Sequence, residues 1–284
     1  MSLQTAEKSN RDKLPYVDTW MNFAGDIKGR ARVDVGDWSQ TNLVLDKRDV
    51  RIFDARPIQG ELSFNREGFR LLDHDPGVDL SGDLAPVAEA YLASVGGLLK
   101  RLSGADMVLA QGTGLLKRYA ERANIKGAIG PSRWVHADYT EKWAHVWVDW
   151  IEGWQNQKLK QYPRFAVYQT WRCISKPPQD NIFVLCDAST INGKDLIVFD
   201  ACMRKPYDAP GNQFESQLCK YDPHHRWYYF SNLKPDELII WQAFDSKSGC
   251  THQPLHNSAD VSGLDDTEPR CSIEARFFAF WNKA

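Results

Sequence analysis

The amino-acid sequence predicts an α+β protein with a double-stranded β-helix core, a jelly-roll (cupin-like) arrangement, and with N-terminal and inserted helices packed outside it. The second half of the 284-residue chain contains short runs rich in β-branched and aromatic residues, separated by loops with Pro, Gly, Asp and Asn. Helical periodicity is confined to segments before residue 155. Short strands with regular turn signals are typical of a sandwich or barrel, and eight strands in two sheets form a jelly roll.

The chain divides into a short arm and one domain. Residues 1–15 are polar, and we expect a flexible N-terminal arm there. No later linker or composition change separates two folding units, so residues 16–284 are predicted to form a single domain. A chain of this length can bury a core without disulfide bonds.

The N-terminal half contributes strands and one helix. Alternating apolar and polar residues at 43–55 and 60–75 predict strands. Residues 85–102 carry apolar side chains on one helical face and are followed by Gly104, which suits a helix C-cap. Residues 105–113 predict another strand.

A second helix is predicted after a short strand-like run at residues 133–140. Thr140 is a suitable N-cap, and tryptophans recur after it on one helical face. We expect this tryptophan stripe to lie in the core. Its members are Trp143, Val146, Trp147, Trp150, Ile151 and Trp154.

In the C-terminal half, the sequence predicts strands only. With the run at 133–140, these strands bring the core to the seven or eight that a jelly roll needs. The expected strands are 164–175, 181–189, 195–203, 217–230, 236–244 and 272–281.

Composition excludes several classes of function. Lysine and arginine number 35 against 37 acidic residues, a net charge of −2, so no positive field favours nucleic acid. No apolar run approaches the 18 or so residues of a membrane-spanning helix, and the N-terminus lacks the apolar stretch of a signal peptide. Six cysteines occur singly, which predicts reduced thiols in a cytoplasmic protein.

The pair His136 and Asp138 is the first feature of the sequence that indicates a metal site. Residues i and i+2 of a strand project from the same face, so this imidazole and this carboxylate can converge. They would supply two ligands of a two-histidine, one-carboxylate triad, which leaves three positions of Fe(II) open. Alone, the pair is also compatible with a histidine hydrogen-bonded to a turn aspartate.

Residues near the C-terminus strengthen the metal interpretation. His256 follows a predicted strand, and Arg270 and Ser272 stand 14 and 16 residues further on, sharing one strand face. A guanidinium with a hydroxyl beside it suits a buried carboxylate, because the guanidinium can bind both oxygens. His225 is the alternative distal histidine, although no comparable Arg-x-Ser follows it.

Several segments resemble the AsaB-like hydroxylase/desaturase family, which includes the cephamycin protein CmcJ and a fungal gibberellin desaturase. They are WVHADYT, YQTWRCIS, FVLCDAST, HHRWYYFSNLKPDELIIWQAFDS, PLHNSA and EPRCSIEARFFAF. The resemblance extends from about residue 45 to the C-terminus. It implies a non-haem Fe(II)- and 2-oxoglutarate-dependent oxygenase, a dioxygenase that hydroxylates, desaturates or oxidatively cyclises a small secondary metabolite, derived from an amino acid or a terpenoid.

The resemblance also implies roles for individual residues. His136, Asp138 and His256 would bind iron, and Arg270 with Ser272 would bind 2-oxoglutarate, while O₂ is the second cosubstrate. Arg276 and Arg172 are alternative anchors for 2-oxoglutarate.

Two other functions stay open at this point. One is a metal-dependent jelly-roll enzyme that does not use 2-oxoglutarate, and the other is a non-catalytic jelly-roll binding module. The sequence leaves the substrate and the oligomeric state undetermined.

Overall fold

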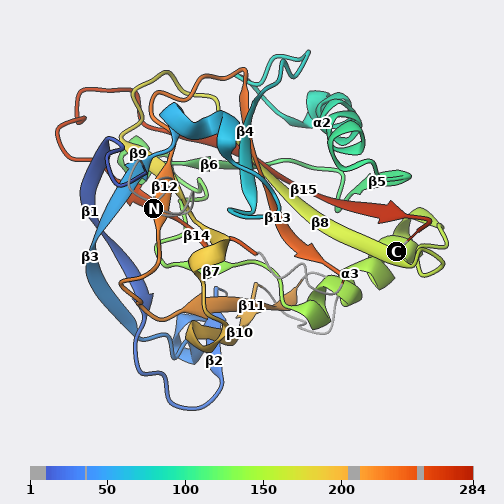
Figure 1. Cartoon of the computed structure of the whole chain (residues 1–284), viewed down its shortest axis with the longest axis horizontal. Coiled ribbons are helices and arrows are strands. Elements are labelled where there is room, and N and C mark those ends of the chain that lie inside the picture. Colours follow the sequence, from blue (N-terminus) through green and yellow to red (C-terminus); the bar gives the residue numbers. More distant parts are fainter. Residues whose placement is uncertain (1–10, 36, 204–211, 248–252, 284) are drawn as a thin grey trace, which may run out of the picture.

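Two β-sheets form the framework of the computed structural model, which describes residues 11–283 except 36, 204–211 and 248–252 (Figure 1). The strands are β1 (Tyr16–Ala24), β2 (Ala31–Asp34), β3 (Leu45–Asp54), β4 (Phe69–Asp73), β5 (Met107–Ala110), β6 (Leu116–Tyr119), β7 (His136–Ala137), β8 (Arg164–Cys173), β9 (Asn181–Cys186), β10 (Leu196–Cys202), β11 (Gln213–Cys219), β12 (Trp227–Tyr229), β13 (Glu237–Asp245), β14 (His256–Asp260) and β15 (Cys271–Trp281).

The two sheets combine strands that are distant in sequence. Sheet A has the order β1-β3-β12-β9-β14-β7-β11-β10-β2, and sheet B has the order β4-β13-β8-β15-β5, with β6 also paired to β15. Neighbours are antiparallel except for β10 with β2 and β12 with β3. The short strand β7 lies between β14 and β11, so the local pairing brings His256 directly opposite His136.

The main core lies between the sheets, and β8 shows how the sequence produces it. Phe165, Val167 and Trp171 belong to the core that both sheets share. Ala166 and Tyr168 alternate with them and belong to a second core on the other side of sheet B. Because both faces of β8 are covered, the strand is buried along almost its whole length.

Helix α2 (Ala88–Ser103) covers the outer side of sheet B, to the upper right in Figure 1. Its side chains Tyr91, Val95 and Leu99 are buried there. The helix ends at Gly104 with a left-handed φ of 66°, a conformation that glycine adopts without steric cost. The C-cap predicted from the sequence is therefore confirmed.

Helix α3 (Glu141–Gln155) begins as predicted, with the Thr140 hydroxyl accepting a hydrogen bond from the Trp143 amide. Of the stripe expected in the core, Ile151 is buried, but none of the tryptophans is fully buried. The helix buries Ile151 together with Ala144 and Val148 against the core between the sheets. Its tryptophans pack mainly on one another beside this face, and Trp154 is 53% exposed. Small side chains allow the helix axis to approach the core closely, which the wide indoles would prevent.

Several strands differ from the sequence prediction. Strands β1 and β2 lie in a region for which no strand was predicted, and no strand was predicted for β14, which begins at His256. The run 217–230 forms two strands rather than one, β11 and β12, which pair with different neighbours. Residues 1–10 of the expected arm lie outside the described residues, while Arg11 forms a 2.8 Å ion pair with the buried Glu67.

Candidate metal centre and carboxylate pocket

Three side chains from β7 and β14 converge between the sheets. Ligand atoms of His136, Asp138 and His256 all lie within 4.8 Å of one another. Asp138 Oδ1 is 3.3 Å from His136 Nε2 and 3.9 Å from His256 Nε2. The two imidazole rings lie 4.2 Å apart between centroids, as their direct cross-strand pairing requires. This arrangement offers one carboxylate oxygen and two imidazole nitrogens to a single ion.

The orientation of His136 is fixed by its other ring nitrogen. Nδ1 lies 2.9 Å from the Trp134 carbonyl oxygen and 3.3 Å from the Ser132 hydroxyl. A carbonyl oxygen only accepts, so Nδ1 carries the proton and Nε2 presents its lone pair to the centre.

The environment keeps His256 neutral. Burial, with His136 close by as a second cause, lowers the pKa of His256 to about 3. Its ring packs 5.1 Å from Trp241 and 5.8 Å from Phe183, between centroids. Metal ions bind the neutral imidazole, so this pKa shift keeps the ligand available over the whole physiological range.

The pKa of Asp138 is also lowered, which for a carboxyl group favours the charged form. Burial alone would raise its pKa, but the Arg276 guanidinium and the two histidines hold the pKa of this carboxyl well below its usual range. Its second oxygen, Oδ2, accepts hydrogen bonds of 2.6 Å from both Gln169 Nε2 and Arg276 Nη2. The carboxylate is therefore ionised, as a metal ligand must be.

A second arginine lies in the wall of the same narrow cavity. Arg270 is 2% exposed and lines the cavity together with the three convergent side chains. Its Nη1 donates to Ser272 Oγ at 2.5 Å and its Nη2 to Asn181 Oδ1 at 2.7 Å, both neutral groups. Its Nε has no hydrogen-bond partner among the described residues, and no described carboxylate forms an ion pair with it. A buried cation without a counter-ion is costly, so this position suits an anionic ligand.

The structure does not bring Arg172 to this cavity. Its guanidinium is fully buried and contacts His74, Tyr91 and the Pro235 carbonyl oxygen. Arg172 stands next to Trp171 on β8, and Trp171 lines the cavity. Successive strand residues face opposite sides, which places Arg172 on the outer side of sheet B.

His225 also lies elsewhere. Its ring is buried, with Nε2 3.6 Å from Asp195 Oδ2 and the ring centroid 6.1 Å from that of Trp227. It is not part of the group of potential metal ligands. Of the two distal histidines considered from the sequence, His256 is the one that joins His136 and Asp138.

The sequence did not point to two further residues of the site. Gln169 contacts Asp138, and Asn181 contacts Arg270. One signal was present: Gln169 is a polar residue inside the apolar run RFAVYQTW of β8. A polar side chain in a strand buried on both faces requires a partner, but the sequence does not say which.

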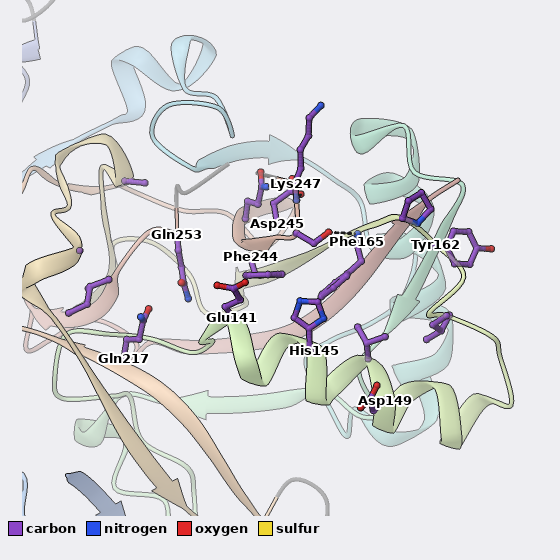
Figure 2. Close-up of a pocket in the computed structure, with 18 of the residues that line it drawn as sticks. Glu141, His145, Asp149, Tyr162, Phe165, Gln217, Phe244, Asp245, Lys247 and Gln253 are labelled. Atoms are coloured by element: carbon purple, nitrogen blue, oxygen red, sulfur yellow. Dashed lines mark hydrogen bonds between the residues drawn. The ribbon is translucent and has the colours of Figure 1, made fainter. Parts of the chain in front are cut away.

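A second, larger cavity of about 1040 Å³ lies beside this centre (Figure 2). Its wall includes Glu141 and His145 of α3, Phe244 near the end of β13, and Lys247 just after that strand. The Gln253 side chain, also in its wall, donates at 2.8 Å to the carbonyl oxygen of Tyr139, the residue after Asp138. Backbone segments that carry the metal-binding group therefore also form the wall of the larger cavity.

These features define a β-sheet protein with a candidate metal centre and a buried arginine in the same cavity, and the comparisons identify its family. A family model described as an oxidoreductase/YMDC permease-like domain matches residues 16–280. The chain belongs to this family. Within the described residues, no helix is long and apolar enough to span a membrane.

Curated relatives of the chain are named as hydroxylase/desaturases and as an Fe(II)/2-oxoglutarate-dependent dioxygenase. The chain is 24% identical to hydroxylase/desaturase efuI of Hormonema carpetanum, over 94% of this chain and 96% of the relative. It is 27% identical to hydroxylase/desaturase CTB9 of Cercospora beticola, over 97% and 90% of the two chains. It is 29% identical to the Fe(II)/2-oxoglutarate-dependent dioxygenase nvfI of Aspergillus novofumigatus, over 85% and 86%.

A solved structure agrees with these relatives. The iron and α-ketoglutarate-dependent endoperoxidase NvfI superimposes with a TM-score of 0.80 at 25% identity, over 93% of this chain and 97% of that chain. The membership in the hydroxylase/desaturase family predicted from the sequence is thus confirmed.

Proposed function

We propose that this protein is a non-haem Fe(II)- and 2-oxoglutarate-dependent oxygenase that hydroxylates, desaturates or oxidatively cyclises a small secondary metabolite. The observation that carries the proposal is the placement of Arg270 and the His136/Asp138/His256 group in one cavity. Relatives with this dependence on iron and 2-oxoglutarate, matched over most of the chain, support it.

The residues that line the narrow cavity fit both Fe(II) and 2-oxoglutarate. His136, Asp138 and His256 offer the ligand set of a facial triad, with the protonation states that a metal requires. Bound Fe(II) with 2-oxoglutarate would supply the oxidising chemistry through O₂. Arg270 and Ser272 would bind the distal carboxylate of 2-oxoglutarate, because Arg270 has an unused donor and a charge without a described carboxylate partner.

The charge of the cavity favours a dianion. Three arginines, Arg118, Arg270 and Arg276, face two carboxylates, Asp138 and Glu274, in its wall. This excess of positive charge increases when a divalent metal binds, so a dicarboxylate is attracted and a neutral ligand is not.

The larger cavity would hold the substrate. Its wall is mixed. Phe165, Phe244 and Leu159 provide apolar surface, Gln217 and Gln253 add uncharged hydrogen-bonding groups nearer to the metal ligands, and Glu141 and Lys247 add charges. This surface suits a small molecule with an apolar body and polar substituents, such as a terpenoid or an amino-acid derivative. The chain's own contribution is to position that molecule and exclude water.

The proposal also covers the fold of the protein, its cellular location and the kind of partner it binds. The two facing sheets are consistent with a double-stranded β-helix formed by one domain over residues 16–284. A cytoplasmic location is supported by the five described cysteines, which are all buried free thiols. The near-neutral charge supports a small-molecule partner rather than nucleic acid.

Anaerobic titration tests the proposal. Apo-protein is titrated with Fe(II) and then with 2-oxoglutarate, and the weak visible charge-transfer band of the chelate is followed. We expect saturation at one equivalent of each component. Iron binding without the band would favour a metal enzyme that does not use 2-oxoglutarate, and no iron binding would favour a non-catalytic binding module.

A further inference from the structure

Two side chains of sheet B reach across the core to the same atom of Asp138. Gln169 on β8 and Arg276 on β15 are direct partners in the antiparallel pairing, so their side chains project from the same face. Each places a nitrogen 2.6 Å from Asp138 Oδ2. Asp138 follows β7 of sheet A, so these bonds join the two sheets at the metal ligand.

The two oxygens of Asp138 therefore have different environments. Oδ1 faces the imidazole nitrogens of His136 and His256 at 3.3 and 3.9 Å. Oδ2 accepts two short hydrogen bonds, one of them charge-assisted. The carboxylate would have to break these bonds to rotate its second oxygen toward the ion.

Gln169 is held in this orientation at a cost to the fold. Its residue is 2% exposed, and its Oε1 has no hydrogen-bond partner among the described residues. A carboxylate only accepts hydrogen bonds, so the amide must direct its nitrogen to Asp138 and leave its oxygen unsatisfied. An apolar side chain would avoid that cost, so the stability of the core does not explain a glutamine here.

Arg276 also lies near a second carboxylate. The same Nη2 lies 3.8 Å from Glu274 Oε2, and Glu274 accepts a 2.6 Å hydrogen bond from Arg118 Nε. Alternating charges thus run from Arg118 to Asp138 along the cavity wall. This row fixes Arg276 beside Asp138, whereas the guanidinium of Arg270 donates to two neutral groups within the part of the chain that the structure describes.

We propose that Gln169 and Arg276 are positioning residues that restrict Asp138 to binding the metal through Oδ1 alone. The proposal rests on the proposed function and assigns Arg276 to the metal ligand rather than to 2-oxoglutarate. A triad of three single donor atoms leaves three positions of a six-coordinate ion open. A chelating cosubstrate occupies two, and O₂ requires the third. If Asp138 bound through both oxygens, one of these positions would be lost.

The test compares Gln169→Met with Gln179→Met. Met has similar length and removes the amide. Gln179 is a buried glutamine whose amide bonds, among the described residues, to the Leu233 backbone, so it controls for the loss of a buried amide. Co(II) affinity and the Co(II) absorption spectrum are measured first. The 2-oxoglutarate affinity of the Fe(II) protein is then measured anaerobically from the charge-transfer band.

For Gln169→Met we expect Co(II) affinity within about threefold of wild type, an altered Co(II) spectrum, and 2-oxoglutarate binding weakened at least about tenfold. Gln179→Met should match wild type in all three. An unchanged spectrum and unchanged 2-oxoglutarate affinity in Gln169→Met would overturn the proposal.

Arg276→Lys provides a second variant if Gln169→Met does not fold, because it keeps the charge but loses the planar guanidinium. We expect the same altered spectrum, and a wild-type spectrum would count against the positioning role. Wild-type protein without any charge-transfer band would refute the proposed function itself. A wild-type band that both variants retain unchanged would refute only the positioning role.

Discussion

The Arg270 guanidinium donates to the Ser272 hydroxyl at 2.5 Å, with both side chains in the interior beside the candidate metal ligands. Their spacing of two residues gives them one strand face. The pair offers a cation and a hydroxyl to the same ligand, which explains why a buried arginine can remain without a described carboxylate partner.

Replacement of Arg270 by Leu should raise the 2-oxoglutarate concentration required for half-saturation at least tenfold. The physical reason is the loss of a buried charge-assisted contact, which is worth about 2–5 kcal/mol. The measurement is the anaerobic titration of the Fe(II) protein. An unchanged requirement would move the anchor to Arg276.

Replacement of His136 or Asp138 by Ala should weaken Co(II) or Fe(II) binding by about a hundredfold or more, since each removal leaves only two ligands. Calorimetry under anaerobic conditions measures the affinity, and circular dichroism verifies the fold. His225→Ala is the matched control and should bind metal like wild type, because His225 lies outside the convergent group. Stoichiometric metal in the His136 and Asp138 variants would disprove the assignment.

Replacement of Arg172 by Leu should act on stability rather than on 2-oxoglutarate. The change removes hydrogen bonds to Tyr91 and His74 and leaves buried acceptors unsatisfied. We expect the free energy of unfolding to fall by about 1–3 kcal/mol. Urea unfolding gives this value, and the folded fraction should keep wild-type affinity for 2-oxoglutarate. A loss of that affinity at unchanged stability would contradict the structural role.

His225 should make the protein less stable in mild acid. Burial lowers its pKa, with Asp195 and Asp222 opposing and His224 reinforcing that shift. The unfolded state, with the ordinary value of 6.5, then binds the proton first. The free energy of unfolding therefore decreases as the pH falls below about 6.5 and stops decreasing once the folded-state pKa is passed.

His225→Gln should reduce that pH dependence. Urea unfolding of metal-free wild type and variant between pH 7.5 and 5 measures it, with other groups such as His256 contributing equally to both. We expect the variant to lose less stability than wild type over this interval, because it lacks the group that binds a proton more readily in the unfolded state. Identical slopes would show that His225 does not contribute.

The sequence determined the local elements and the chemically active residues of this protein. Periodicity located α2 and α3, and the cap residues Thr140 and Gly104 located one end of each. Two-residue spacing identified His136 with Asp138 and Arg270 with Ser272, because strand geometry alone gives each pair a common face. Resemblance of motifs identified the family.

Only the tertiary structure decided which distant residues complete the site. The choice between His256 and His225 depends on the pairing of β14 with β7, which involves residues far apart in the chain. The separation of Arg172, Arg270 and Arg276 into three environments depends on which sheet face each occupies and what covers it. Gln169 acquires its contact with Asp138 across the two sheets. Such contacts follow from sheet register and packing, for which local residue preferences carry no information.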